Sequence, residues 1–219
     1  MGFMLLWQQV KLIYIFYLIN LGVFMKAVEN LPEGFKEIYS LDLQKNKKTA
    51  VAVNLLALVI AALMAAVMNF FVPIYYLFDF ENGLLNYFLK FAVLMALIVA
   101  YMILHESVHG IAMKISGTKK VKYGFTGLYA FAGSKDFYDK KSYIFIALSP
   151  IVFLGVIIAV ANFLVPTEWF WTVYFLQIAN ISGAAGDLFV TVKFLRFPKD
   201  ILIQDYGVRM KVFSEKSEI

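Results

Sequence analysis

Two histidines and a glutamate lie close together in the stretch LHESVHG, at residues 104–110. His105 and His109 are the only histidines in the chain, and Glu106 lies between them. Residues four apart on a helix share a face, so both imidazoles reach one point and make half of a tetrahedral zinc site. In an H-E-x-x-H pattern the glutamate does not bind the metal but acts as the catalytic base. The alternative is a pair of capping or interface histidines that lie beside a glutamate by chance.

A catalytic zinc also requires a third protein ligand. The chain has no cysteine and no further histidine, so an aspartate or glutamate must supply it. Of the 15 acidic residues, the two that lie well inside apolar segments are Glu106 and Asp187, and Asp187 is therefore the predicted third ligand. Small residues at 182–186 would let its helix approach a neighbour closely, although ordinary helix packing also explains them. Asp205, just beyond the last apolar segment, is the best alternative carboxylate.

Asn180 precedes Asp187 by seven residues, about two helical turns, and so shares its face. Its amide is a candidate to bind the substrate backbone or a developing oxyanion. A hydrogen-bonded amide between two helices is the alternative interpretation.

The composition is that of a membrane protein, with 62% hydrophobic and 16% charged residues and a mean hydropathy of +0.75. Four apolar segments are each long enough to cross about 30 Å of hydrocarbon as a helix. They are residues 50–77, 87–113, 143–165 and 169–195. The predicted fold is an all-α polytopic membrane protein with a four-helix transmembrane core. The second and fourth spans run in the same direction, which places the histidine pair and Asp187 at nearly the same depth.

Lysines alternate between the two sides of these spans. Residues 25–49 carry five lysines and residues 114–142 carry seven, whereas residues 78–86 and 166–168 carry no lysine or arginine. By the positive-inside rule, both ends of the core and the loop at 114–142 are cytoplasmic. The net charge of +5 therefore reflects membrane topology, and nucleic acid is not an expected partner.

The chain divides into a segment at 1–24, a cytoplasmic segment at 25–49, the transmembrane core at 50–195 and a cytoplasmic tail at 196–219. The apolar segment 1–24 is open to four interpretations: a fifth span, an interfacial helix, an uncleaved anchor, or a misassigned start that precedes the more conventional start at Met25. Within the cytoplasmic loop, VKYGFTGLYAFAG at 121–133 alternates aromatic residues around glycines. This pattern predicts a small β-hairpin, with a plain amphipathic loop as the alternative.

These motifs resemble a known family. The chain resembles the bacterial zincin-peptidase family of membrane proteins in three motifs: LHESVHG in one span, LSP at 148–150 in the next and SGAAGD at 182–187 in the last. That family is similar to the site-2-protease-type intramembrane zinc metalloproteases. The resemblance covers about residues 30–210. It implies His105, His109 and Asp187 as zinc ligands and Glu106 as the catalytic base. The chain departs from better-known site-2 proteases because its aspartate follows a glycine, in GAAGD, rather than standing in Leu-Asp-Gly.

The sequence therefore predicts a zinc-dependent membrane metalloprotease of the cell membrane. Its expected partners are the lipid bilayer and a membrane-protein or peptide substrate. Two other functions remain open. One is a metal-binding or proton-handling transporter, which would need a polar path across the whole bilayer. The other is an inactive membrane scaffold, which would not require Glu106.

Overall fold

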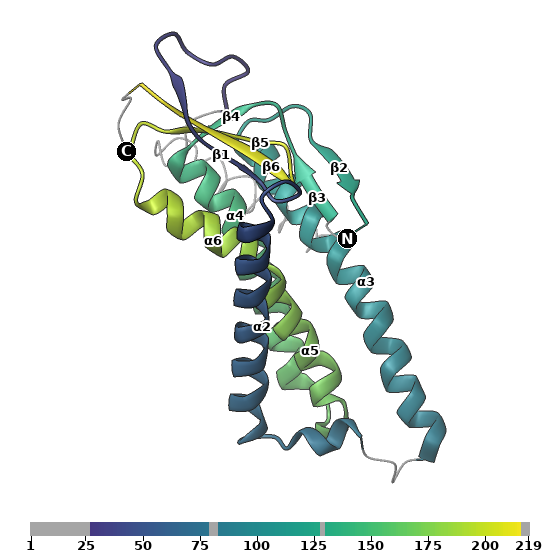
Figure 1. The fold of residues 1–219 in the computed structure, drawn as a ribbon. Helices are drawn as coiled ribbons and strands as arrows, with labels where there is room; N and C mark the ends of the chain where they lie inside the picture. The colour runs from purple at the N-terminus through teal and green to yellow at the C-terminus, as the bar shows by residue number, and fades with distance from the viewer. Residues whose placement is uncertain (1–26, 79–82, 128–129, 216–219) are drawn as a thin grey trace, which may run out of the picture.

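A computed structural model describes residues 27–78, 83–127 and 130–215; the predicted segment 1–24 lies outside these residues. Within these residues, four helical segments are long and apolar enough to cross a membrane. They are α2 (Lys47–Asn69), α3 (Gly83–Ile115), α4 (Lys140–Leu164) and the consecutive helices α5 (Thr167–Gly183) and α6 (Ala185–Leu195). The helices α2, α3 and α5 lie along the long axis of the molecule (Figure 1). The predicted four-helix core is confirmed.

The fourth span is broken rather than continuous. Ala184 has φ −85° and ψ 18°, which ends α5, and α6 starts at the next residue. In Figure 1, α6 leaves the direction of α5 and runs beneath a β-sheet. Ala184 and Ala185 are fully buried, so the small residues of this segment allow both a sharp turn and close packing. The break places Asp187 in the first turn of α6.

The first span is shorter than predicted, because α2 ends at Asn69 rather than near residue 77. The Asn69 side chain accepts a hydrogen bond of 2.8 Å from the Ile74 N–H, and a 3₁₀ turn, η1 (Ile74–Leu77), follows. The Trp171 indole donates to the carbonyls of Val72 and Pro73, at 3.0 and 3.1 Å. These bonds tie the connection after α2 to the start of α5.

A four-stranded antiparallel sheet caps one end of the helices, in the order β1-β6-β5-β4. The strands are β1 (Lys36–Asp42), β4 (Phe137–Asp139), β5 (Leu202–Asp205) and β6 (Arg209–Ser214). The sequence analysis predicted no strand in the two segments that flank the core. The structure adds this sheet to the predicted fold, and it joins those two segments to the loop between α3 and α4.

The sheet is covered on both faces. One face packs on the helices through a large core that includes Tyr138, Tyr143, Phe194 and Ile203. The other face packs, through Phe137, Leu202 and Phe213, against the segment at residues 28–35 that precedes β1. This double burial explains why all four residues of β5 are buried, including the polar residues at its end. Strands from the two ends of the chain are thereby fixed against the ends of α3, α4 and α6.

The predicted hairpin is present as β2 (Lys122–Phe125) and β3 (Ala130–Gly133), which pair antiparallel. Two glycines set its position. Gly110 on α3 leaves room for the ring of Tyr123, which a Cβ at residue 110 would overlap. Gly133 lies against the backbone of Tyr206 and Gly207, where a Cβ would come within 2.5–2.9 Å of backbone atoms. The hairpin therefore rests on both α3 and the turn between β5 and β6.

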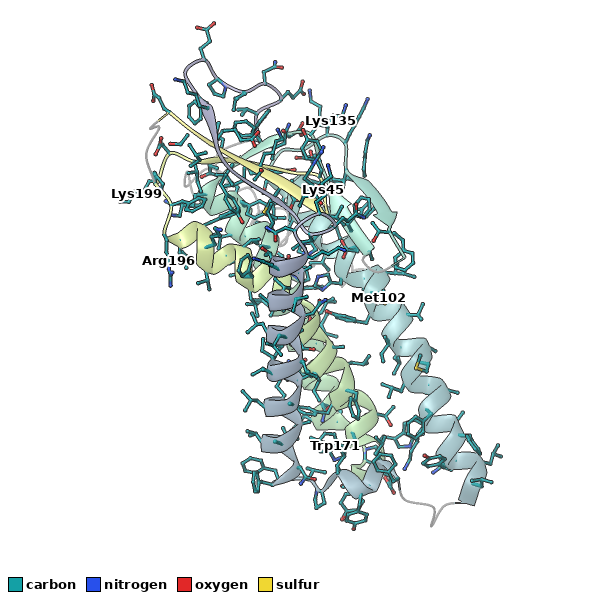
Figure 2. All side chains as sticks on the ribbon, in the orientation of Figure 1. Lys45, Met102, Lys135, Trp171, Arg196 and Lys199 are labelled. Carbon is teal, nitrogen blue, oxygen red and sulfur yellow. The ribbon has the colours of Figure 1, made fainter. Side chains whose placement is uncertain are left out.

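Basic side chains gather at the sheet end of the molecule. Figure 2 shows Lys45, Lys135, Arg196 and Lys199 around the sheet, and Trp171 near the opposite end of the helices. This distribution gives the two ends of the helical bundle different electrostatic character.

Candidate metal centre

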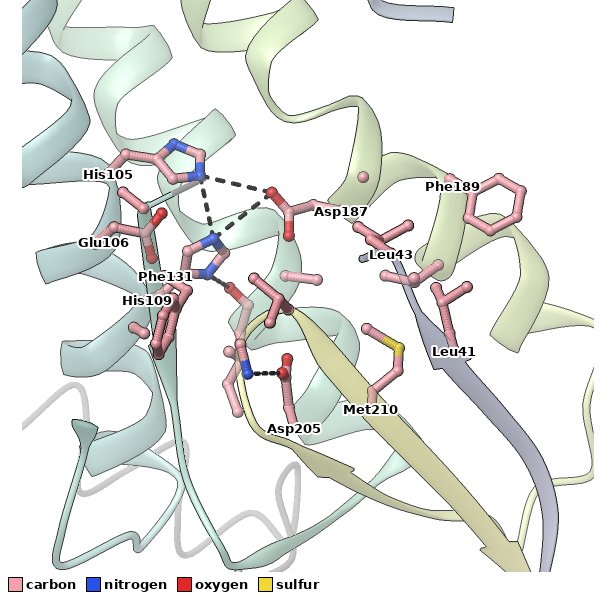
Figure 3. Close-up of a pocket in the computed structure, with 18 of the residues that line it drawn as sticks. Leu41, Leu43, His105, Glu106, His109, Phe131, Asp187, Phe189, Asp205 and Met210 are labelled. Atoms are coloured by element: carbon pink, nitrogen blue, oxygen red, sulfur yellow. Dashed lines mark hydrogen bonds and ion pairs between the residues drawn. The ribbon is translucent and has the colours of Figure 1, made fainter. Parts of the chain in front are cut away.

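Three side chains from two helices converge next to the sheet (Figure 3). The Nε2 atoms of His105 and His109 lie 3.1 Å apart. Oδ2 of Asp187 lies 3.5 Å from Nε2 of His105 and 3.6 Å from Nε2 of His109. The histidines lie one turn apart on α3, and the break at Ala184 brings Asp187 to them from α6. The structure thus brings together the three residues that the sequence predicted as a ligand set.

The opposite nitrogen of His109 fixes its protonation. Nδ1 of His109 lies 2.9 Å from the carbonyl oxygen of Ile146 on α4. A carbonyl oxygen only accepts, so Nδ1 must carry the hydrogen. In the neutral ring, Nε2 then holds a free lone pair that points toward His105 and Asp187.

A chain of hydrogen bonds orients His105 in the same way. Nδ1 of His105 lies 2.9 Å from the Tyr101 hydroxyl, and that hydroxyl donates to Oδ1 of Asn180 at 3.3 Å. The Asn180 Nδ2 donates to the carbonyl of Ile151 at 3.0 Å, which fixes the amide orientation. Because the one hydroxyl hydrogen goes to Asn180, the Tyr101 oxygen accepts from Nδ1 of His105. Nε2 of His105 is therefore also free of hydrogen in the neutral ring.

Two imidazole lone pairs and a carboxylate oxygen thus point at one another with no hydrogen between them. Such a group of acceptors is stabilised by a positive charge between them, either a metal ion or a proton on one ring. Ligand atoms around a tetrahedral zinc with bonds of 2.0–2.1 Å are separated by about 3.3–3.4 Å. The three separations of 3.1, 3.5 and 3.6 Å bracket this value. The donor set, two nitrogens and one oxygen, is also one that zinc binds in catalytic sites. The residues present fit a zinc ion.

Glu106 lies beside this group, on the face of α3 that meets the hairpin. Its carboxylate lies near the backbone N–H of Ala132 in β3. It is half-buried, whereas His105 and His109 are buried. Glu106 lines a cavity of about 150 Å³ together with the three converging residues. Its carboxylate therefore lies at the same cavity as the candidate metal ligands without being one of them.

A second, larger cavity continues this space between α2 and α3. Its volume is about 350 Å³. Both cavities are lined by His105, Glu106 and Ala130, and the second also reaches Asn54 on α2 and Met102 on α3. The candidate metal centre is thus connected to the apolar, helical part of the molecule as well as to the sheet.

Asp205, the alternative carboxylate, lines the same small cavity. Its Oδ2 accepts from the Tyr143 hydroxyl at 2.7 Å, and its Oδ1 accepts from the Gly207 N–H at 2.7 Å. Burial raises the pKa of Asp205 to about 6, although both hydrogen bonds favour the charged form. The group of ligand atoms that lie within 4.8 Å of one another contains Asp187 and not Asp205.

Asn180 lies away from the cavity lining and is fully buried. Its amide connects α5 to α4 and to Tyr101, which is the interhelical role named as the alternative to substrate binding. Sequence reasoning missed Tyr101 and Tyr143. Tyr101 lies four residues before His105, so helical spacing was a usable signal. Tyr143 meets Asp205 only through the tertiary fold, and no local pattern indicates that contact.

Comparison with known proteins agrees with the motifs. Residues 97–202 match a protein family described as "Putative zincin peptidase". This match confirms the family resemblance, and the matched segment contains the histidine pair, Glu106 and Asp187. An uncharacterised 24.7 kDa protein of Pyrococcus woesei is 31% identical over 126 residues, which is 55% of this chain and 54% of the relative. The match thus spans about half the length of that relative. No solved structure gives a significant match.

Proposed function

We propose that the protein is a zinc-dependent peptidase that hydrolyses peptide bonds at or within the membrane. One observation carries the proposal: Nε2 of His105, Nε2 of His109 and Oδ2 of Asp187 converge within 3.1–3.6 Å. Hydrogen bonds behind both imidazoles leave these nitrogens as acceptors. The match to a family described as zincin peptidases supports the same activity.

The three ligands leave one side of the site for substrate and water. A zinc ion there would polarise the scissile carbonyl and lower the pKa of water toward about 7. Glu106 accepts a proton from the attacking water as the water oxygen bonds to the carbonyl carbon. The carboxyl of Glu106 then delivers that proton to the amide nitrogen as the C–N bond breaks. The products are a carboxylic acid and an amine.

The surroundings of Glu106 suit an extended peptide that arrives from the membrane. The cavity between α2 and α3 offers space beside the apolar spans. Ala130, Phe131 and Ala132 of β3 line the smaller cavity next to the base. Among the described strands, β3 pairs only with β2, so its residues at the cavity are candidates to align a substrate by strand addition.

The proposed orientation places the sheet and both ends of the core in the cytoplasm. It rests on the lysines, which gather at the sheet end in Figure 2. Reporter fusions after residues 83, 130 and 219 should read outside, inside and inside. An outside signal after residue 130 would reverse the assignment.

The Glu106→Gln variant tests the activity. The amide has nearly the same shape and cannot act as a base, and Glu106 is not among the three converging ligands. The variant should bind zinc like the wild type in elemental analysis and lose cleavage of a membrane-peptide substrate by at least a factor of about 100. Full turnover by this variant, or wild-type protein that takes up no zinc, would refute the proposal.

A further inference from the structure

The small cavity contains one carboxylate that the proposed chemistry does not use. Asp205 lies at the end of β5 and is 8% exposed. Figure 3 shows it below the group formed by His105, His109 and Asp187. Its two hydrogen bonds, from Tyr143 and Gly207, occupy two of about four acceptor sites on a carboxylate. Asp205 therefore keeps acceptor capacity toward the cavity.

No cation among the described residues balances this charge. Neither lysine nor arginine lines the cavity, and the described ion pairs do not include Asp205. With zinc bound, its two positive charges are matched by Asp187 and Glu106. Asp205 then leaves the site with one uncompensated negative charge. A buried carboxylate without a cationic partner is costly, which favours a partner that arrives with the substrate.

The walls around Asp205 are apolar. Leu41 on β1, Phe189 on α6 and Met210 on β6 line the same cavity, as do Met113 and Ile146. Such walls suit the methylene stem of a long basic side chain, which buries its carbon atoms and presents its charge at the tip. The volume of about 150 Å³ is of the size needed for one side chain rather than for a second peptide segment.

We propose that Asp205 binds the basic side chain of a lysine or arginine next to the scissile bond of the substrate, and so makes the enzyme selective for basic residues. This inference rests on the proposed peptidase function. Asp205 is a specificity-determining residue in this scheme, and the catalytic steps remain with Glu106.

A purely structural role is the competing explanation. The bond from the Gly207 N–H to Oδ1 closes the turn after β5, and the Tyr143 bond joins this turn to α4. An asparagine would keep both contacts, because its oxygen accepts from Gly207 and its amide donates to the Tyr143 oxygen. Asp205→Asn therefore removes the charge while preserving the tether, and it separates the two explanations.

Peptide binding measures selectivity without turnover. The probes are short, dye-labelled apolar peptides that carry one lysine at successive positions, with matched peptides that carry acetyl-lysine instead. Zinc-loaded Glu106→Gln protein should bind the best lysine peptide about 10 to 100 times more tightly than its acetyl-lysine partner. The Glu106→Gln/Asp205→Asn protein should bind the two equally. Glu106→Gln/Asp200→Asn is the control, since Asp200 bonds Ser214 in the same tail and does not line the cavity.

Cleavage by the wild type distinguishes a failure of the proposed Asp205 role from a failure of the peptidase proposal. Cleavage of neutral peptides without any advantage for lysine overturns the role of Asp205 and leaves the peptidase proposal standing. A lysine preference that survives Asp205→Asn also overturns it. Failure to cleave any peptide, with zinc bound, overturns the peptidase proposal and this inference with it.

Discussion

The Tyr101 hydroxyl lies 2.9 Å from Nδ1 of His105, on the side of the ring that faces away from Asp187. Tyr101 donates in turn to Asn180, so the tyrosine oxygen can only accept from the imidazole. One hydroxyl thus sets both the orientation and the tautomer of a candidate ligand. Partners that hold a metal-binding histidine in this way contribute to metal affinity without touching the metal.

Tyr101→Phe should weaken zinc binding. The ring of His105 loses its acceptor, and the neutral tautomer with hydrogen on Nε2, in which Nε2 has no lone pair for the metal, becomes available. We expect a 10- to 100-fold loss of affinity, measured by competition with a calibrated chelator. Tyr174→Phe is the matched control, because the Tyr174 hydroxyl donates to the Met64 carbonyl at 3.4 Å and does not contact the histidines. Equal losses in both variants would show a general effect on helix packing.

Asp187 and Asp205 should differ in their effect on the metal. Asp187→Asn replaces a charged ligand oxygen 3.5–3.6 Å from both imidazoles by a neutral one, and zinc affinity should fall by at least about 100-fold. Asp205→Asn leaves the three converging atoms unchanged, so zinc should stay bound. Elemental analysis after dialysis against a weak chelator checks both variants. Loss of zinc from Asp205→Asn alone would show that Asp205, and not Asp187, is the third ligand.

The candidate ligands could be predicted because local spacing and scarcity select them. His105 and His109 are the only histidines and lie one turn apart, and Asp187 is one of two carboxylates well inside apolar segments. The sequence did not indicate that α5 ends at Gly183, since a run of small residues fits both a continuous close-packed helix and a turn. Asp187 nevertheless lies near His105 and His109, because the turn occurs just before Asp187 and its side chain reaches α3.

The sheet was harder to predict. Its strands are three to seven residues long, and β1 pairs with β6 from the opposite end of the sequence. No local pattern specifies such a pairing. One signal was readable: ILIQDYGVRMKVF at 201–213 places a glycine between two apolar stretches, which is typical of a hairpin. Gly207 has φ +95° in the turn that joins β5 to β6.

Gly133→Ala should destabilise the contact between the hairpin and the sheet. An added Cβ would come within 2.5–2.9 Å of the Tyr206 and Gly207 backbone, and a backbone cannot rotate away as a side chain can. We expect a loss on the order of 1–3 kcal/mol, seen as a lower melting temperature. Gly183→Ala is the control, because no atom lies within 4 Å of its added Cβ. Equal stability of wild type and Gly133→Ala would mean that the hairpin is not fixed against this turn.

Asp205→Asn should stabilise the metal-free protein at neutral pH. Burial raises the pKa of Asp205 from 3.8 to about 6, so ionisation costs more free energy in the folded protein than in the unfolded chain. The groups that act on it are Tyr143 on α4, Tyr138 on β4, His109 on α3 and Asp187 on α6. The folded protein therefore loses stability as pH rises from about 4 to about 6, and the asparagine variant does not.

The difference at pH 7.5 should be on the order of 2–3 kcal/mol in favour of the variant, and it should disappear near pH 4. Thermal unfolding with chelator present, at both pH values, measures it. Metal-free protein is required because a bound cation would itself favour the charged carboxylate. A variant that is less stable at pH 7.5 would instead show that the charge of Asp205 stabilises the fold, because the asparagine keeps both hydrogen bonds. If removal of the charge stabilises the protein, the charged Asp205 side chain destabilises the fold. Such a destabilising residue is expected where binding requires it.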